Sequence, residues 1–222
     1  MDVKQTATLE IISDVVCPWC YIGKRRFEQA LELLDPDLGL TIHWRAYELN
    51  PNMPLDGVER RSHYARKFGS KEEAQRLLDN ITANAHNDGL AMDYEKITQV
   101  PNTIKAHRLI WYATQRDKQN EIVNALFEAY FVTGRNIGDQ SELVEIAREI
   151  GLDPADAEVF LNSDEAHDII EKEILNARQA GIQGVPAFVV DGQYLFSGAQ
   201  SPETISLSIK RAVERRSRQA GK

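Results

Sequence analysis

The chain has 222 residues, of which 42% are hydrophobic and 27% charged, and its formal net charge is −8. A chain of this size and composition buries its core without disulfide or metal support. The acidic charge disfavours nucleic acid as a partner, and no apolar run reaches the roughly 18 residues of a membrane span. Because the amino terminus also lacks a basic region followed by an apolar one, we expect a cytoplasmic protein.

The first segments predict a strand, a helix and a second strand. Residues 8–16 are rich in β-branched side chains and predict a buried strand that stops at a Cys-Pro-Trp-Cys run. The helix that follows has apolar residues at spacings of three and four, and Asp35-Pro36 ends it. Residues 40–49 predict the second strand, and this order implies a parallel pair.

Helical patterns replace strand patterns from about residue 57 to residue 180. Apolar stripes predict helices over residues 71–87, 103–116, 121–133 and 166–180. Asp139 and the Asp153-Pro154 pair predict the starts of two more helices. Each stripe is more typical of packing than of a cofactor site. Strand patterns then return at 184–190 and 193–196, joined by an Asp-Gly turn, before a final helix that begins near Ser201.

The two cysteines of the chain, Cys17 and Cys20, stand where the first strand gives way to the helix. In a reducing compartment such a pair is more often catalytic or metal-binding than structural. A disulfide across so short a loop would stabilise the fold by only about 2 kcal/mol. The N–H groups and dipole at a helix start favour a thiolate at Cys17, which is therefore the expected nucleophile. Cys20, one turn further in, is the expected resolving residue.

Two other roles for the cysteine pair are less favoured. A zinc site needs about four ligands, but the chain has no further cysteine, and the spacing of its histidines is not paired, at positions 43, 63, 86, 107 and 167. A purely structural disulfide is disfavoured by the compartment and the short loop. Two inert buried thiols would leave the spacing of the pair unexplained. Redox chemistry without a bound metal is the favoured interpretation.

Three stretches carry a more specific signal: residues 13–24 with the cysteine pair, residues 181–189 with Gly-Val-Pro, and residues 197–200. They closely resemble the FrnE-like branch of the DsbA family of thioredoxin-fold thiol-disulfide oxidoreductases, and the similarity, which includes residues 102–109, covers nearly the whole chain. It implies an α/β thioredoxin-like fold with an all-helical insertion. Residues 1–56 and 181–222 would form the discontinuous thioredoxin-like domain, and residues 57–180 the insertion domain.

The resemblance also implies an activity. The chain would be an enzyme that exchanges disulfides as an oxidase, reductase or isomerase, acting on proteins or on small molecules with thiols or disulfides. Glutathione is a candidate redox partner, and no bound cofactor is expected. The partners would include neither nucleic acid nor membrane, and the chain would be a monomer or a homodimer.

The same resemblance assigns roles to residues around the cysteines. The Val185-Pro186 bond is expected to be cis and to lie beside the pair, with Pro186 part of the catalytic site and the main chain of Val185 free to pair with an extended substrate. Pro18 and Trp19 are expected to meet the substrate and to tune the redox potential. Strongly oxidising relatives have histidine in place of Trp19, so a less oxidising potential is expected here.

A buried carboxylate that relays the proton of the resolving thiol is also typical of the fold. Glu10 is the candidate by its position in the first strand, although the segment from it to Cys17 is one residue longer than in some relatives. Asp14 is the alternative, and a plain surface or turn role remains open for either residue.

Two other functions remain open. Chromene-carboxylate isomerases and kappa-class transferases share this architecture, so a glutathione-dependent isomerase or transferase is the main alternative. In such an enzyme Asn50 and Asn102 would line a small-molecule cleft, although capping or turn roles are more typical of both. Those relatives usually have serine in place of Cys17 and lack the second cysteine. A noncatalytic binding module that uses the cleft between sheet and helices is the third possibility.

Overall fold

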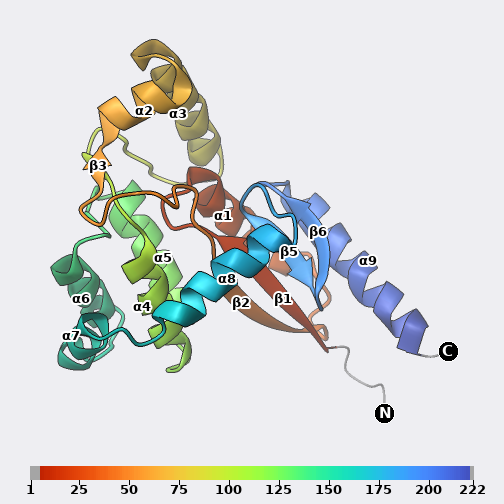
Figure 1. Cartoon of the computed structure of the whole chain (residues 1–222). Coiled ribbons are helices and arrows are strands. Elements are labelled where there is room, and N and C mark those ends of the chain that lie inside the picture. The colour runs from red at the N-terminus through yellow and green to blue at the C-terminus, as the bar shows by residue number, and fades with distance from the viewer. Residues whose placement is uncertain (1–5, 221–222) are drawn as a thin grey trace.

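A computed structural model describes residues 6–220 and contains a four-stranded sheet in the order β2-β1-β5-β6 (Figure 1). The expected parallel pairing of β1 with β2 is confirmed, whereas β1 with β5 and β5 with β6 are antiparallel. The strands are β1 (Thr6–Ser13), β2 (Gly39–Ala46), β5 (Ala187–Val190) and β6 (Gln193–Ser197). The absence of a secretory signal was inferred from residues 1–5, which lie outside the described range.

The two faces of the sheet are covered by different helices. Phe27 of α1 (Pro18–Glu32) packs on Phe188 of β5, which is the register partner of Ile11 in β1. α9 (Pro202–Ala220) packs beside α1. α8 (His167–Gln179) crosses the opposite face (Figure 1), where its Glu173 bonds to Arg45 of β2. Because side chains alternate along a strand, the odd residues of β1 face α1 and the even ones face α8.

The segment between β2 and β5 is largely helical. It also contains a short antiparallel pair, β3 (Val58–Glu59) with β4 (Gln99–Val100). Apart from α8, its helices are α2 (Arg60–Phe68), α3 (Lys71–Asn87), α4 (Ile104–Thr114), α5 (Gln119–Phe131), α6 (Gln140–Glu149) and α7 (Pro154–Asn162). α2 carries a largely polar sequence and was not predicted. The side chain of Glu59 begins it by accepting bonds from the N–H groups of Arg61 and Ser62.

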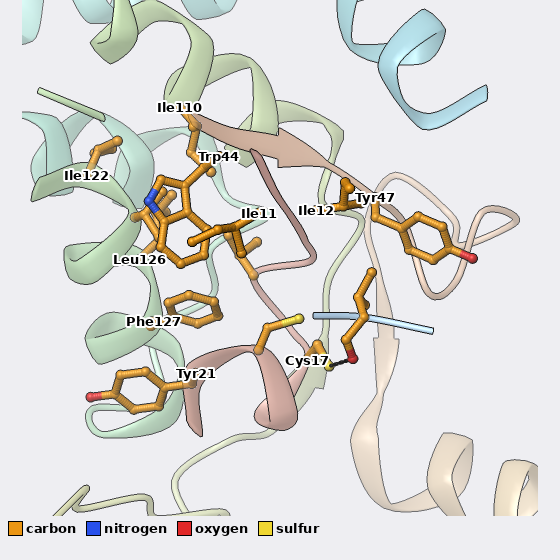
Figure 2. Close-up of a cluster of buried hydrophobic side chains, with 14 of the residues drawn as sticks. Ile11, Ile12, Cys17, Tyr21, Trp44, Tyr47, Ile110, Ile122, Leu126 and Phe127 are labelled. Carbon is orange, nitrogen blue, oxygen red and sulfur yellow. Dashed lines mark hydrogen bonds between the residues drawn. The ribbon is translucent and has the colours of Figure 1, made fainter. Parts of the chain in front are cut away.

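Aromatic and amide side chains join this helical segment to the sheet and to α1. Tyr21 of α1 stacks on Phe127 and Phe131 of α5, with ring centroids 5.2 and 5.7 Å apart. Gln119 of α5 bonds to both the N–H and the carbonyl of Trp44, which protects the edge of the sheet at β2. Figure 2 shows Tyr21, Phe127 and Trp44 among the buried side chains that lie between α1, α5 and the sheet. Within residues 6–220 no helix has the length and apolarity needed to cross a bilayer.

Candidate active site

A tight turn places the first cysteine at the start of α1. β1 ends at Ser13 rather than at Val16, because the chain turns at Asp14 and the Cys17 N–H donates to the Asp14 carbonyl at 2.9 Å. Cys17 is extended and is the N-cap of α1, with Pro18 at the first helical position. This position of proline is favoured because its missing N–H would have no helical partner. Cys17 therefore stands just before the first turn of α1, and Cys20 lies within that turn.

The two cysteines are unpaired and buried, with exposed fractions of 3% for Cys17 and 0% for Cys20. Burial raises the pKa of the Cys20 thiol well above its ordinary value, and the neighbouring Cys17 raises it further. The hydroxyl of Ser13 and the backbone of Asp14 lower that pKa by a smaller effect. Cys20 is therefore a protonated thiol near neutral pH and must lose its proton before it can attack a disulfide.

The loop before β5 brings a proline and a backbone carbonyl to the cysteines. The Val185-Pro186 bond is cis, as expected. The Sγ of Cys17 donates to the Val185 carbonyl at 3.6 Å, drawn as the dashed line in Figure 2. Pro18 and Trp19, which follow Cys17 in the sequence, are half-buried. The structure thus brings Cys17, Cys20, Val185 and Pro186 into one site from segments far apart in the chain.

Gly23 of α1 provides the space for Pro186. A Cβ at Gly23 would lie 2.7 Å from Cγ of Pro186. Glycine to alanine in a helix normally stabilises by roughly 0.5–1 kcal/mol. Here we expect Gly23→Ala to destabilise the fold by about 1–3 kcal/mol, because the added methyl must push α1 away from Pro186. We also expect slower disulfide exchange, because the shift separates Cys17 from the Val185 carbonyl.

The midpoint of urea unfolding and the rate of exchange measure both effects of Gly23→Ala. Gly184→Ala is the matched control, since a Cβ there meets no atom within 4 Å although the residue lies in the same loop as Pro186. An unfolding midpoint for Gly23→Ala at or above that of Gly184→Ala would contradict the close packing of Gly23 on Pro186.

Asp14 is a buried carboxylate that organises the loops around the site. Its Oδ2 accepts from the Leu49 N–H at 2.8 Å, and its Oδ1 accepts from the Val16 N–H at 3.5 Å. The Nε2 of buried His107, on α4, lies 3.6 Å from Oδ1 of Asp14 and 3.0 Å from the Tyr47 carbonyl. This carboxylate therefore ties the turn before Cys17 to the loop after β2 and to the helical segment.

Glu10 does not lie with the cysteines. Its carboxylate bonds to Nε of Arg45 at 2.7 Å, and the same guanidinium bonds to Glu173 of α8 at 3.0 Å. As an even residue of β1 it faces α8, whereas Cys20 lies in α1 on the other face. The position of Glu10 does not support the proton-relay role expected for it, because the strand register turns its side chain away from the resolving thiol.

Both asparagines singled out by the sequence have local hydrogen-bonding roles. The side chain of Asn102 accepts from the Ile104 N–H at the start of α4 and donates to the Met53 carbonyl. Asn50 accepts from Lys67. Sequence reasoning missed two residues of this region, Ser13 and His107. The signal for Ser13 was a polar residue at an odd position of a strand whose other odd positions are apolar.

The geometry defines a class of protein: a thioredoxin-like sheet with two cysteines at the start of its first helix and a cis-proline loop against them. The model of the DSBA-like thioredoxin domain matches residues 8–210, and the chain belongs to that family. Its described residues contain no cluster of three His, Cys, Asp or Glu side chains suited to a metal ion.

The chain is also similar to individual proteins, and these similarities are consistent with the family assignment. A probable DsbA oxidoreductase from Streptomyces coelicolor is 33% identical, with a TM-score of 0.86 over 93% of this chain and 89% of that one. The uncharacterized protein YwbO from Bacillus subtilis is 25% identical over 92% of this chain and 96% of its own length. The cytosolic disulfide reductase DsbM from Pseudomonas aeruginosa, in a structure with glutathione, shares the fold at 17% identity, with a TM-score of 0.64 over 93% of this chain and 99% of that one.

Proposed function

We propose that the chain is a thiol-disulfide oxidoreductase that exchanges disulfides through Cys17 and Cys20. The observation that carries this proposal is the contact of the Cys17 sulfur with the Val185 carbonyl, one helical turn from the fully buried Cys20. Cys17 is the sulfur nearer to the surface and to the cis-proline loop, so it meets the substrate first. Cys20 can reach only a disulfide that already includes Cys17.

The reaction has two balanced steps. The thiolate of Cys17 attacks one sulfur of a substrate disulfide, which forms a mixed disulfide and releases the other substrate sulfur as a thiolate. Cys20 then loses its proton and attacks the Cys17 sulfur, which forms the Cys17–Cys20 disulfide and releases the second thiolate. The substrate gains two electrons and the protein loses two. Oxidation of substrate thiols is the reverse sequence.

We propose protein or small-molecule disulfides as substrates, with glutathione as a redox partner in the cytoplasm. The Val185 main chain would pair with an extended substrate, and Pro18 and Trp19 would flank its sulfur. The cytosolic reductase DsbM, found with glutathione, supports the small-molecule part of this proposal by its fold. Isomerisation of wrong disulfides is the same chemistry, with release of the substrate before Cys20 attacks.

Equilibration in glutathione redox buffers tests the proposal. We expect the chain to lose two thiols and gain one Cys17–Cys20 disulfide, at a potential less oxidising than in relatives with histidine in place of Trp19. Trp19→His should shift this equilibrium toward the dithiol, because an imidazole can stabilise the Cys17 thiolate better than a neutral indole. A chain that forms no internal disulfide over the whole range of buffers would contradict the proposed function.

A further inference from the structure

A cavity of about 240 Å³ is lined in part by Ser13, the last residue of β1. It lies between β2, α4, α5 and α8, and its lining includes the exposed Gln115 and Ile169 as well as the buried Ser13 and His107. One water needs only roughly 10–15 Å³ of such space together with polar partners. The cavity is therefore large and polar enough to hold water between the surface and Ser13.

Ser13 is a buried polar group in the lining of this cavity. Its side chain is 95% buried, being 5% exposed, and among the described residues its Oγ has no hydrogen-bond partner of ordinary geometry. A buried hydroxyl without a partner is unfavourable and rare in folded proteins. Ser13 is an odd residue of β1 and so faces α1, where Cys20 lies. Its hydroxyl also counteracts the effect of burial on the pKa of Cys20, because it can bond to the thiolate.

His107 is the titratable side chain of α4 in the same cavity. Its Nε2 lies beside the Tyr47 carbonyl, and a proton on Nε2 leaves Nδ1 as an acceptor. The other charged or titratable groups around Ser13 and His107 come from α1, the loops after β1 and β2, β2 itself and α8. They are Cys17, Cys20, Asp14, Glu48, His43, Arg45, Glu173 and Arg178.

We propose that Ser13 is a catalytic hydroxyl that passes the proton of Cys20 into this cavity, with His107 as its positioning partner through the cavity water. The inference rests on the proposed disulfide exchange and concerns its second step. As Cys20 attacks the mixed disulfide, the Ser13 oxygen takes the thiol proton and gives its own proton to water in the cavity. The new Cys17–Cys20 bond releases the substrate thiolate, which takes up a proton from solvent.

Ser13→Ala tests this route when the full-length reduced chain is mixed with glutathione disulfide. Acid quenching and mass spectrometry follow the glutathione adduct on Cys17 with time. We expect the adduct to resolve about 10²-fold more slowly in Ser13→Ala, the usual scale of general acid-base catalysis. Its rate should rise in proportion to hydroxide, since the thiolate must then form without a relay. Ser13→Thr, which keeps the hydroxyl, should resolve near the wild-type rate.

Three further variants separate this role from packing and from the first step. Cys20→Ser and Ser13→Ala/Cys20→Ser should form the adduct at equal rates, because Ser13 takes no part in the attack by Cys17. His107→Gln retains a donor for the Tyr47 carbonyl but lacks the ring Nδ1 acceptor that would orient the cavity water, so it should slow resolution and leave adduct formation unchanged. Resolution at the wild-type rate in His107→Gln would contradict the role of His107.

The remaining outcomes are equally decisive. If Ser13→Ala resolves as fast as the wild-type chain at every pH, or if Ser13→Thr is as slow as Ser13→Ala, the relay through the hydroxyl is wrong. If the wild-type chain forms no adduct at all, the proposed function fails and this inference fails with it. A normal wild-type reaction with an unimpaired Ser13→Ala would contradict the inference alone.

Discussion

Replacing Cys17 by serine is expected to lower disulfide exchange by about 10³-fold or more, on the scale of losing a catalytic nucleophile. A serine hydroxyl in the same place stays protonated and attacks disulfides poorly, whereas the cysteine can react as thiolate. The Val185 carbonyl and Pro186 remain in place in this variant, so the loss would come from the missing sulfur alone. Reduction of glutathione disulfide, followed by the release of glutathione, measures the effect.

Cys20→Ser is the matched control for Cys17→Ser, because it removes the same atom one helical turn further in. We expect it to complete the first step and then stop, with one substrate molecule held on Cys17. Incubation with cell extract should therefore trap mixed disulfides on Cys20→Ser and none on Cys17→Ser. Protein partners would indicate a role on proteins, and glutathione alone a small-molecule role. Retained isomerase turnover by Cys17→Ser would instead favour a glutathione-dependent isomerase or transferase.

The helical segment contributes to the same site. Burial raises the pKa of Tyr64 to about 12, and the Cys17 charge adds to this shift. Burial also raises the pKa of Tyr94, again with a contribution from Cys17. Both phenols are therefore neutral near Cys17, and the hydroxyl of Tyr94 is buried without a hydrogen-bond partner among the described residues. Tyr64 of α2 and Tyr94 of the loop before β4 thus place two neutral phenols in the surroundings of Cys17.

The parts of the site that could be predicted from the sequence are those set by local pattern. The Cys-Pro-Trp-Cys run at a strand-helix junction and the cis Val185-Pro186 bond were both predicted, the second through the family resemblance. The position of Glu10 could not be predicted, because the turn at Asp14 sets how many residues separate β1 from α1 and hence which strand face meets Cys20. Ser13 and His107 were missed because the cavity between them is formed only when α4 packs beside β2.

The helical segment should depend strongly on one buried arginine. Arg108 of α4 is 4% exposed and its guanidinium lies over the Phe160 ring, 5.1 Å from the centroid. It donates to four backbone carbonyls at the end of α7 and before α8, those of Phe160, Leu161, Ser163 and Glu165. The last carbonyls of a helix have no partner within it. Arg108 therefore caps α7 and holds the link to α8.

Arg108→Met is expected to lower the free energy of unfolding by about 3 kcal/mol or more, because it removes the guanidinium donor from four carbonyls, among them the buried one of Leu161, while the volume is kept. The midpoint of urea unfolding should fall with an unchanged slope. Arg116→Met is the control: Arg116 is exposed and bonds to one carbonyl, that of Tyr112, while stacking on the ring of the same residue. We expect Arg116→Met to lower the free energy of unfolding by no more than about 1 kcal/mol. Equal midpoints for the two variants would contradict the capping role. A much lower midpoint for Arg108→Met would show that Arg108 of α4 stabilises the end of α7 and its link to α8.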